Sequence, residues 1–126
     1  MAFEAPGASE FSFDAGADLS ALQYHFVKLN SSGQVVAIAA TTDQAIGILQ
    51  NKPGAGESAT VWMAGISKYK TSAAIAAGAV VGVSANGRGV GAATKSVGQA
   101  LDTTTGADQL GSIAFDCRRP YATAIS

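Results

Sequence analysis

The sequence contains a single cysteine, few charged residues and no long apolar run. One cysteine, Cys117, excludes both an internal disulfide and a metal site built from several thiolates. The most apolar stretch, residues 73–83, is broken by Gly78 and Gly82 and is shorter than the roughly 18 residues that span a bilayer. Charged residues make up 13% of the chain and its net charge is -1. Because nucleic-acid-binding surfaces need a basic patch, we expect no contact with nucleic acid. Because the longest apolar run is too short to span a bilayer, we expect no contact with a membrane.

Large side chains are also scarce, although 48% of the residues are hydrophobic. Aromatic residues account for only 7%, and most of the apolar content is alanine and valine. Burial of apolar area contributes roughly 25 cal/mol per Å², and small side chains supply little area each. A chain of 126 residues suits one domain. We therefore expect a thin core whose burial is completed by neighbouring subunits.

Short alternating segments bounded by turn residues predict β-strands along most of the chain. Residues 22–29 and 34–39 flank the turn Asn30–Gly33 and predict a hairpin, in which Leu22, Tyr24 and Phe26 would share one face. The dipeptide Asn86–Gly87 predicts a second hairpin. Further strands are expected at 45–49, 59–67, 79–84, 90–94, 97–102 and 111–116.

Only residues 73–78 favour helix, as one turn of alanines that Gly78 would end. Turn signals every 8 to 12 residues are typical of sandwiches and barrels. The sequence thus predicts an all-β fold, a compact β-sandwich or β-barrel of about seven or eight short strands.

The two ends of the chain differ from the middle. Residues 1–20 are expected to form an extended N-terminal arm, residues 21–117 the β domain and residues 118–126 a C-terminal tail. The arm contains Phe3, Phe11 and Phe13, which predict a segment that anchors on a partner; a frayed terminus is the alternative. The N-terminus lacks the basic and apolar regions of a secretory signal, so synthesis in the cytoplasm is expected.

No set of residues predicts catalysis. The sole histidine, His25, is expected on a strand face opposite Tyr24 and Phe26, without the nucleophile and orienting carboxylate of a triad. Cys117 stands beside Arg118 and Arg119, which could lower its thiol pKa. A small apolar residue at a strand end is the simpler interpretation of Cys117. We therefore expect no enzyme.

Two binding motifs are approached but not completed. The glycines of residues 87–96 resemble a phosphate loop, but Thr94 stands where a glycine would precede the lysine and serine. Ala92 likewise occupies a glycine position of the dinucleotide motif. Asp102, Asp108 and Asp116 are too far apart for a calcium loop. No cofactor and no metal are expected.

The order of these segments resembles the capsid decoration (cement) proteins of tailed bacteriophages. The resemblance runs over residues 22–116, through the strand and glycine turn at 27–35 and the segments at 45–51, 59–66, 76–83 and 110–115. It does not extend to the arm or the tail. It implies an all-β protein without enzymatic activity on the outer surface of the virion capsid. It also implies contact with the major capsid protein and self-association, as a homotrimer.

The leading hypothesis is therefore a cement protein that stabilises a phage head by bridging major capsid subunits. Another virion structural protein, such as a tail or fibre module, is the first alternative. A small ligand-binding β-barrel is the second, although the sequence shows no convergent polar groups of the kind such a pocket requires.

Overall fold

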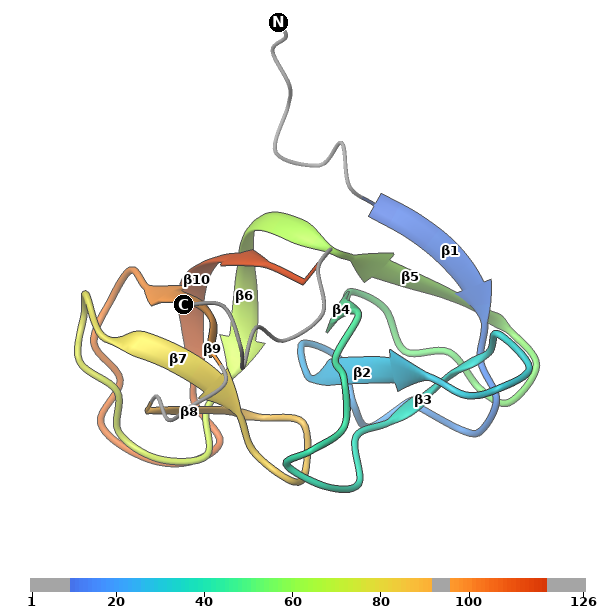
Figure 1. Cartoon of the computed structure of the whole chain (residues 1–126), viewed down its shortest axis with the longest axis horizontal. Coiled ribbons are helices and arrows are strands. Elements are labelled where there is room, and N and C mark those ends of the chain that lie inside the picture. Colours follow the sequence, from blue (N-terminus) through green and yellow to red (C-terminus); the bar gives the residue numbers. More distant parts are fainter. Residues whose placement is uncertain (1–9, 92–95, 118–126) are drawn as a thin grey trace, which may run out of the picture.

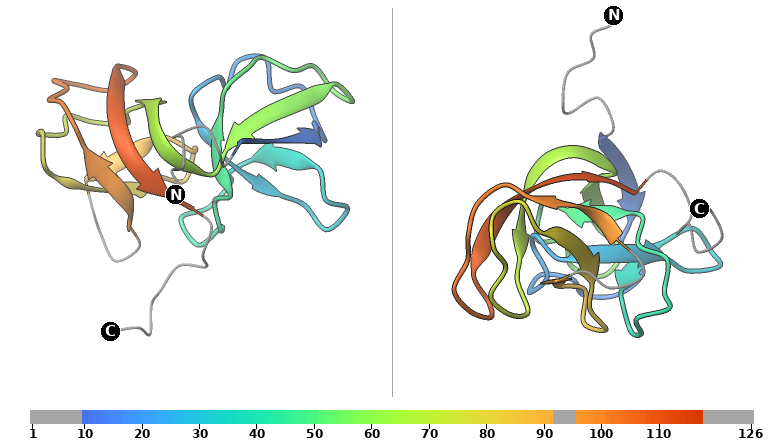
Figure 2. Two further views of the ribbon diagram at one scale, coloured as in Figure 1. Left: turned by 90° about the horizontal axis from the view of Figure 1, so that it is seen from above. Right: turned by 60° about the vertical axis from the view of Figure 1, so that its left-hand side comes forward.

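The computed structural model describes residues 10–91 and 96–117, which form two five-stranded antiparallel sheets lying side by side (Figures 1 and 2). The all-β prediction is confirmed, with ten strands in place of the seven or eight expected. The described residues form no helix, and so they include no helix long enough to span a membrane. Phe3 and residues 118–126 lie outside the described part of the chain.

The first sheet contains the N-terminal five strands in the order β1-β5-β4-β2-β3. Its strands are β1 (Glu10–Asp14), β2 (Phe26–Leu29), β3 (Val35–Ala37), β4 (Gly47–Leu49) and β5 (Ser58–Trp62). The second sheet contains the rest in the order β6-β10-β9-β7-β8. Its strands are β6 (Ala64–Lys70), β7 (Val80–Val83), β8 (Gly89–Gly91), β9 (Ser96–Ala100) and β10 (Leu110–Asp116).

The two sheets repeat one topology, because each strand of the second sheet takes the place of the strand five earlier in the chain. The registers agree as well. Equivalent facing pairs are Phe13–Ala59 and Tyr69–Gly111, Val27–Gly47 and Val81–Gly98, and Leu49–Val61 and Ala100–Ile113. The described fold is therefore an internal duplication of a five-stranded unit.

Each unit curls towards a closed barrel through one parallel bridge. In the first unit Ala15, just after β1, bridges Val35 of β3. In the second unit Thr71, just after β6, bridges Gly89 of β8 in the same way. Curling turns one face of each sheet inwards, where alanine and valine are buried together with larger side chains such as Leu49, Tyr69 and Ile113.

Both predicted hairpins are confirmed, and they occupy equivalent places in the two units. The β2–β3 turn uses Gly33 at φ +78°, with the Asn30 side chain accepting two backbone N–H bonds. The β7–β8 turn uses Gly87 at φ +80°. Positive φ favours glycine, which is why both turns contain one at this position.

The units are joined where the β7–β8 hairpin meets β2. The backbone N–H of Phe26 donates to the carbonyl of Gly87 at 2.7 Å. A Cβ atom on Gly87 would lie 2.6 Å from the Phe26 carbonyl oxygen, so only glycine permits this approach. Phe26 and Ile48 of the first unit are buried in the same apolar cluster as Tyr69 and Phe115 of the second. This shared cluster makes the two units one packed body.

Three local expectations differ from the structure. The strand expected at 59–67 is divided at Met63, where the chain passes from the first sheet to the second. Residues 22–25 form turns before β2, with Tyr24 at φ +68°, so they do not extend the strand. The helical turn at 73–78 is absent, because Ile75 bridges Thr104 and Gly78 sits in a turn at φ +86°.

The arm expected at residues 1–20 also differs from the structure over residues 10–20. Strand β1 pairs along its whole length with β5. Ala15 and Leu19 are buried in the first unit. Residues 10–20 are therefore part of the β domain, because their apolar side chains complete the inside of the first barrel.

Candidate protein-docking surface

A row of four side chains crosses the outer face of the second sheet. The facing pairs are Ile66–Ala114, Ala114–Gln99 and Gln99–Val80, so the row runs over β6, β10, β9 and β7. Directly facing residues share one side of a sheet, and the alternate residues of β10 are buried inside. We call Ile66, Ala114, Gln99 and Val80 the outer row.

Large apolar side chains gather on this face. Leu110 lies on the outer side of β10, and Leu101 follows β9 with its N–H bonded to the carbonyl of Ser112. Together with Ile66 and Val80 they are between 46% and 53% exposed. Of the six exposed large hydrophobic residues in the described chain, these are four. Grouped exposed apolar side chains are a feature of surfaces that bind other proteins.

A shallow hollow of about 320 Å³ opens beside the outer row, where the two units meet. Ile66, Lys68 and Ser112 line it from the second unit, and Tyr24 and Trp62 line it from the first. The Lys68 ammonium lies 5.8 Å from the centre of the Tyr24 ring, a cation–π distance. Lys68 is its only ionisable lining residue apart from the tyrosine. The hollow thus places the side chains of Tyr24, Trp62 and Ile66 around one opening at the joint between the units.

The first sheet carries an equivalent row, and there the second unit covers it. Its facing pairs are Glu10–Trp62, Trp62–Ile48 and Ile48–Phe26. Ile48 and Phe26 are buried in the shared cluster, and Trp62 packs against it. The same place in the fold is therefore an interface in one unit and an exposed surface in the other.

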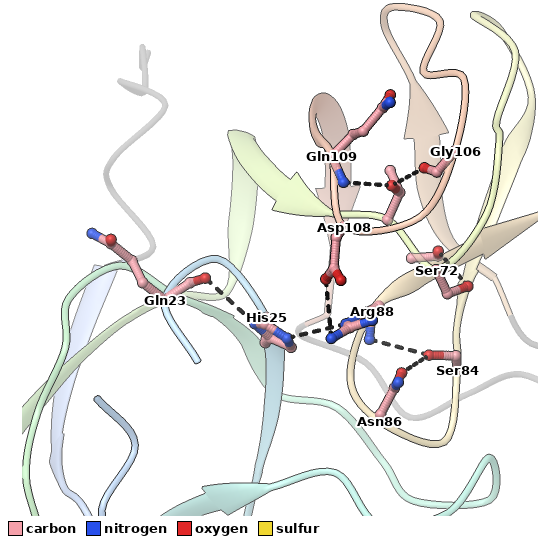
Figure 3. Close-up of polar contacts among 11 residues, drawn as sticks. Gln23, His25, Ser72, Ser84, Asn86, Arg88, Gly106, Asp108 and Gln109 are labelled. Carbon is pink, nitrogen blue, oxygen red and sulfur yellow. Dashed lines mark hydrogen bonds and ion pairs between the residues drawn. The ribbon is translucent and has the colours of Figure 1, made fainter. Parts of the chain in front are cut away.

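A polar cluster also links the two units (Figure 3). Arg88, just after the Gly87 turn, forms an ion pair of 3.0 Å with Asp108. The Arg88 Nε–H also donates to Nε2 of His25 at 3.4 Å, and Nδ1 of His25 lies 3.4 Å from the Gln23 carbonyl. His25 is thus held as a neutral ring that accepts from Arg88 and donates to the backbone.

This geometry gives His25 a structural role. Burial lowers the pKa of His25, and the positive charge of Arg88 lowers it further. The sequence placed His25 on a strand face, whereas it lies in the turn before β2 and is buried. Neither a serine nor a cysteine is bonded to it, within the described residues.

The other candidate residues also have structural roles. Burial, followed by the charge of Asp116, raises the pKa of the Cys117 thiol to about 12, so the small apolar interpretation of this residue holds. Asp102 accepts the Ser112 backbone N–H, and Asp108 pairs with Arg88. The described chain brings no three metal-ligating side chains together. Of the phosphate-loop segment, residues 92–95 lie outside the described part.

The phenylalanines expected to contact a partner separate into different roles. Phe13 packs against the buried cluster of the first unit. Phe11 faces Val61 on the neighbouring strand but remains 49% exposed at the edge of the sheet. Phe3 lies outside the described residues. The capsid-contact role of Phe3, Phe11 and Phe13 stays a prediction.

No family model matches the chain, and no curated protein matches it. Among solved structures, the fold is similar to the N base of the head fibre protein gp8.5 from bacteriophage phi29. The TM-score is 0.66 over 86% of this chain and 93% of that chain, at 12% sequence identity. At this identity the likeness shows a shared fold.

Proposed function

We propose that this protein is a structural component of a bacteriophage virion, attached to the outside of the head as a decoration (cement) protein. The observation that carries the proposal is the fold shared with the base of a phage head fibre, over nearly the whole of both chains. The exposed large hydrophobic side chains of the described residues support it, because they offer contact area to other proteins.

Stabilisation would follow from preferential binding to the assembled shell. A protein that binds neighbouring major capsid subunits together, and not the free subunit, shifts the equilibrium towards the assembled lattice. Many copies per shell add their contacts through avidity. This mechanism needs no enzyme activity, no cofactor and no nucleic acid.

The first test is attachment to shells that lack the protein. Purified protein is mixed with such heads, which are then pelleted and heated. We expect saturable binding and a higher disruption temperature of the shell. Absence of binding at micromolar concentrations would contradict the proposal.

The contact through the N-terminal segment can be tested separately. A deletion of residues 1–20 would remove β1 and the buried Ala15 and Leu19, so it would damage the fold. A deletion of residues 1–9 combined with Phe11→Ser avoids this, and we expect weaker binding to heads. Ser12→Ala is the matched control, since Ser12 is exposed on the opposite face of the same strand. Unchanged binding of the shortened protein would exclude the arm as a contact.

A fibre module is the second candidate, favoured by the same fold likeness. In that case this chain would form the base that holds a longer fibre on the head. A cement protein would instead cover the shell in many copies. Mass-spectrometric quantification in heads separated from tails distinguishes the two. Enough copies to contact every major capsid subunit support cement, and far fewer copies than subunits support fibres.

A further inference from the structure

The joint between the two units has two complementary parts. One part is the row on the first sheet, in which Phe26 and Ile48 are buried. The other is the β7–β8 hairpin of the second unit, whose Gly87 lies against Phe26 and whose Val83 packs on the shared cluster. A hairpin of one unit therefore docks on the outer sheet face of the other.

Both parts of this joint are present a second time in the chain, and there the described residues leave them exposed. The counterpart of the covered row is the outer row, where Ile66 and Val80 are about half exposed. The counterpart of the docked hairpin is the β2–β3 hairpin. There Leu29, which corresponds to Val83, is exposed, and a Cβ on Gly33 would meet nothing within 4 Å. One chain thus carries an unused copy of each side of its own interface.

The geometry points to a second copy of this chain as the occupant: we propose that the β2–β3 hairpin of one copy docks on the outer row of the next. The contact would repeat the internal joint between chains. It is head to tail, because the two surfaces involved are different, and such contacts generate rings or filaments. The proposal concerns the purified protein alone and does not depend on attachment to a capsid.

Two side chains of the outer row are much smaller than those they replace. Val80 stands in place of Phe26, and Ala114 in place of Trp62. Leu101 and Leu110 enlarge the apolar face at positions where the first unit has Gln50 and Ser58. The apolar area lost through the smaller side chains at positions 80 and 114 is thus offset by the area that Leu101 and Leu110 add. An interface between separate chains requires such area.

Sedimentation velocity over a range of protein concentrations tests the association. We expect a reversible increase of mass above the monomer for the unaltered protein. Val80→Asp and Leu29→Asp are each expected to weaken association at least tenfold. Phe11→Asp is the matched control, because Phe11 is as exposed as Val80 but belongs to neither surface. Circular dichroism checks that all variants are folded, and Ile66→Asp replaces Val80→Asp if that variant is not.

A mixture of the two impaired variants makes the test specific for a head-to-tail contact. Val80→Asp keeps an intact hairpin, and Leu29→Asp keeps an intact outer row. Mixed together, they are expected to form a complex of two chains that cannot grow further. A two-fold contact of the outer row with itself would give no such complex. A monomer at every concentration, an effect of Phe11→Asp equal to that of Val80→Asp, or a mixture that stays monomeric would each overturn the proposal.

Discussion

The two units of the chain have the same strand order and register but fill their barrels differently. In the first unit Phe13 faces Ala59 and is only partly buried. In the second, the equivalent Tyr69 is fully buried and faces Gly111. A Cβ on Gly111 would lie 2.9 Å from the Tyr69 ring. One backbone arrangement therefore buries the aromatic ring more completely when the positions around it lose their side chains.

The contrast shows which features specify the five-stranded unit. The aromatic residue and its neighbours change together, which keeps the inside of each barrel filled. The close approach between neighbouring strands at Gly47 and at the equivalent Gly98 is the same in both units. Each of these glycines lies against a carbonyl on the next strand, that of Trp62 and that of Ala114 respectively. The close strand contact is thus common to both units, and the packing inside is particular to each.

The largest expected effect comes from adding a methyl group at those two glycines. Gly47→Ala and Gly98→Ala would each place a Cβ 2.2 Å from a backbone carbonyl oxygen, which cannot rotate away. We expect each substitution to lower the free energy of unfolding by about 3 kcal/mol or more. Urea denaturation measures this, with Gly91→Ala as control because nothing lies within 4 Å there. Clearly unequal losses would argue against the equivalence of the two units.

A slightly smaller loss is expected when the second unit is given a residue of the first. Gly89 occupies the place of Val35, and a Cβ there would lie 2.3 Å from the Tyr69 ring. Gly89→Val should lower the free energy of unfolding by about 2–3 kcal/mol through overpacking. Adding Tyr69→Leu should recover part of that loss, because the smaller side chain leaves room. Strictly additive effects in this double-mutant cycle would show that the side chains at positions 69 and 89 do not compete for the same space.

A gain of stability is expected from removing one oxygen atom. The Tyr69 hydroxyl is buried and has no hydrogen-bond partner within the described residues. An unsatisfied buried polar group costs about 1–3 kcal/mol, so Tyr69→Phe should raise the free energy of unfolding by about 1 kcal/mol. The reverse change in the first unit, Phe13→Tyr, should alter it by less than about 0.5 kcal/mol, since a hydroxyl there reaches water. A lower free energy of unfolding in Tyr69→Phe would disprove the inference that the Tyr69 hydroxyl has no hydrogen-bond partner.

The smallest effect is a pH dependence at the joint between the units. The folded protein lowers the pKa of His25 below its ordinary value of 6.5, so the unfolded chain binds the proton more readily. Stability contributed by the neutral ring is present above pH 6.5 and is lost as the pH falls below it. Denaturation curves between pH 7.5 and 5 should show this decline, and His25→Gln should reduce it. An unchanged slope in that variant would assign the pH dependence to other groups.

The sequence was sufficient for the fold class and both hairpins, because these depend on local signals. Alternating apolar residues predict strands, and the glycines at 33 and 87 mark turns that require positive φ. Residues 22–25 and 73–78 were predicted less well. There, turns and single bridges to distant strands override the local propensity for strand or helix.

The duplication and the docking surface were not predicted from the sequence. The units share a few identical residues, such as Val27 with Val81 and Gly33 with Gly87, but loops of different length shift the spacing between them. Leu101 and Leu110 look like core residues in the sequence, and only the pairing of β10 shows that they face outwards. The signal that could have revealed the repeat was the pair of glycine turns followed by Gly47 and Gly98.

The burial of Cys117 has a consequence for contacts between copies of this chain. An accessible thiol on each copy would allow chains to cross-link under oxidising conditions. Only the thiolate reacts readily, and a thiol with a pKa of about 12 is almost entirely protonated near neutral pH. The folded chain thus keeps its single thiol buried and protonated, which disfavours covalent links between folded copies.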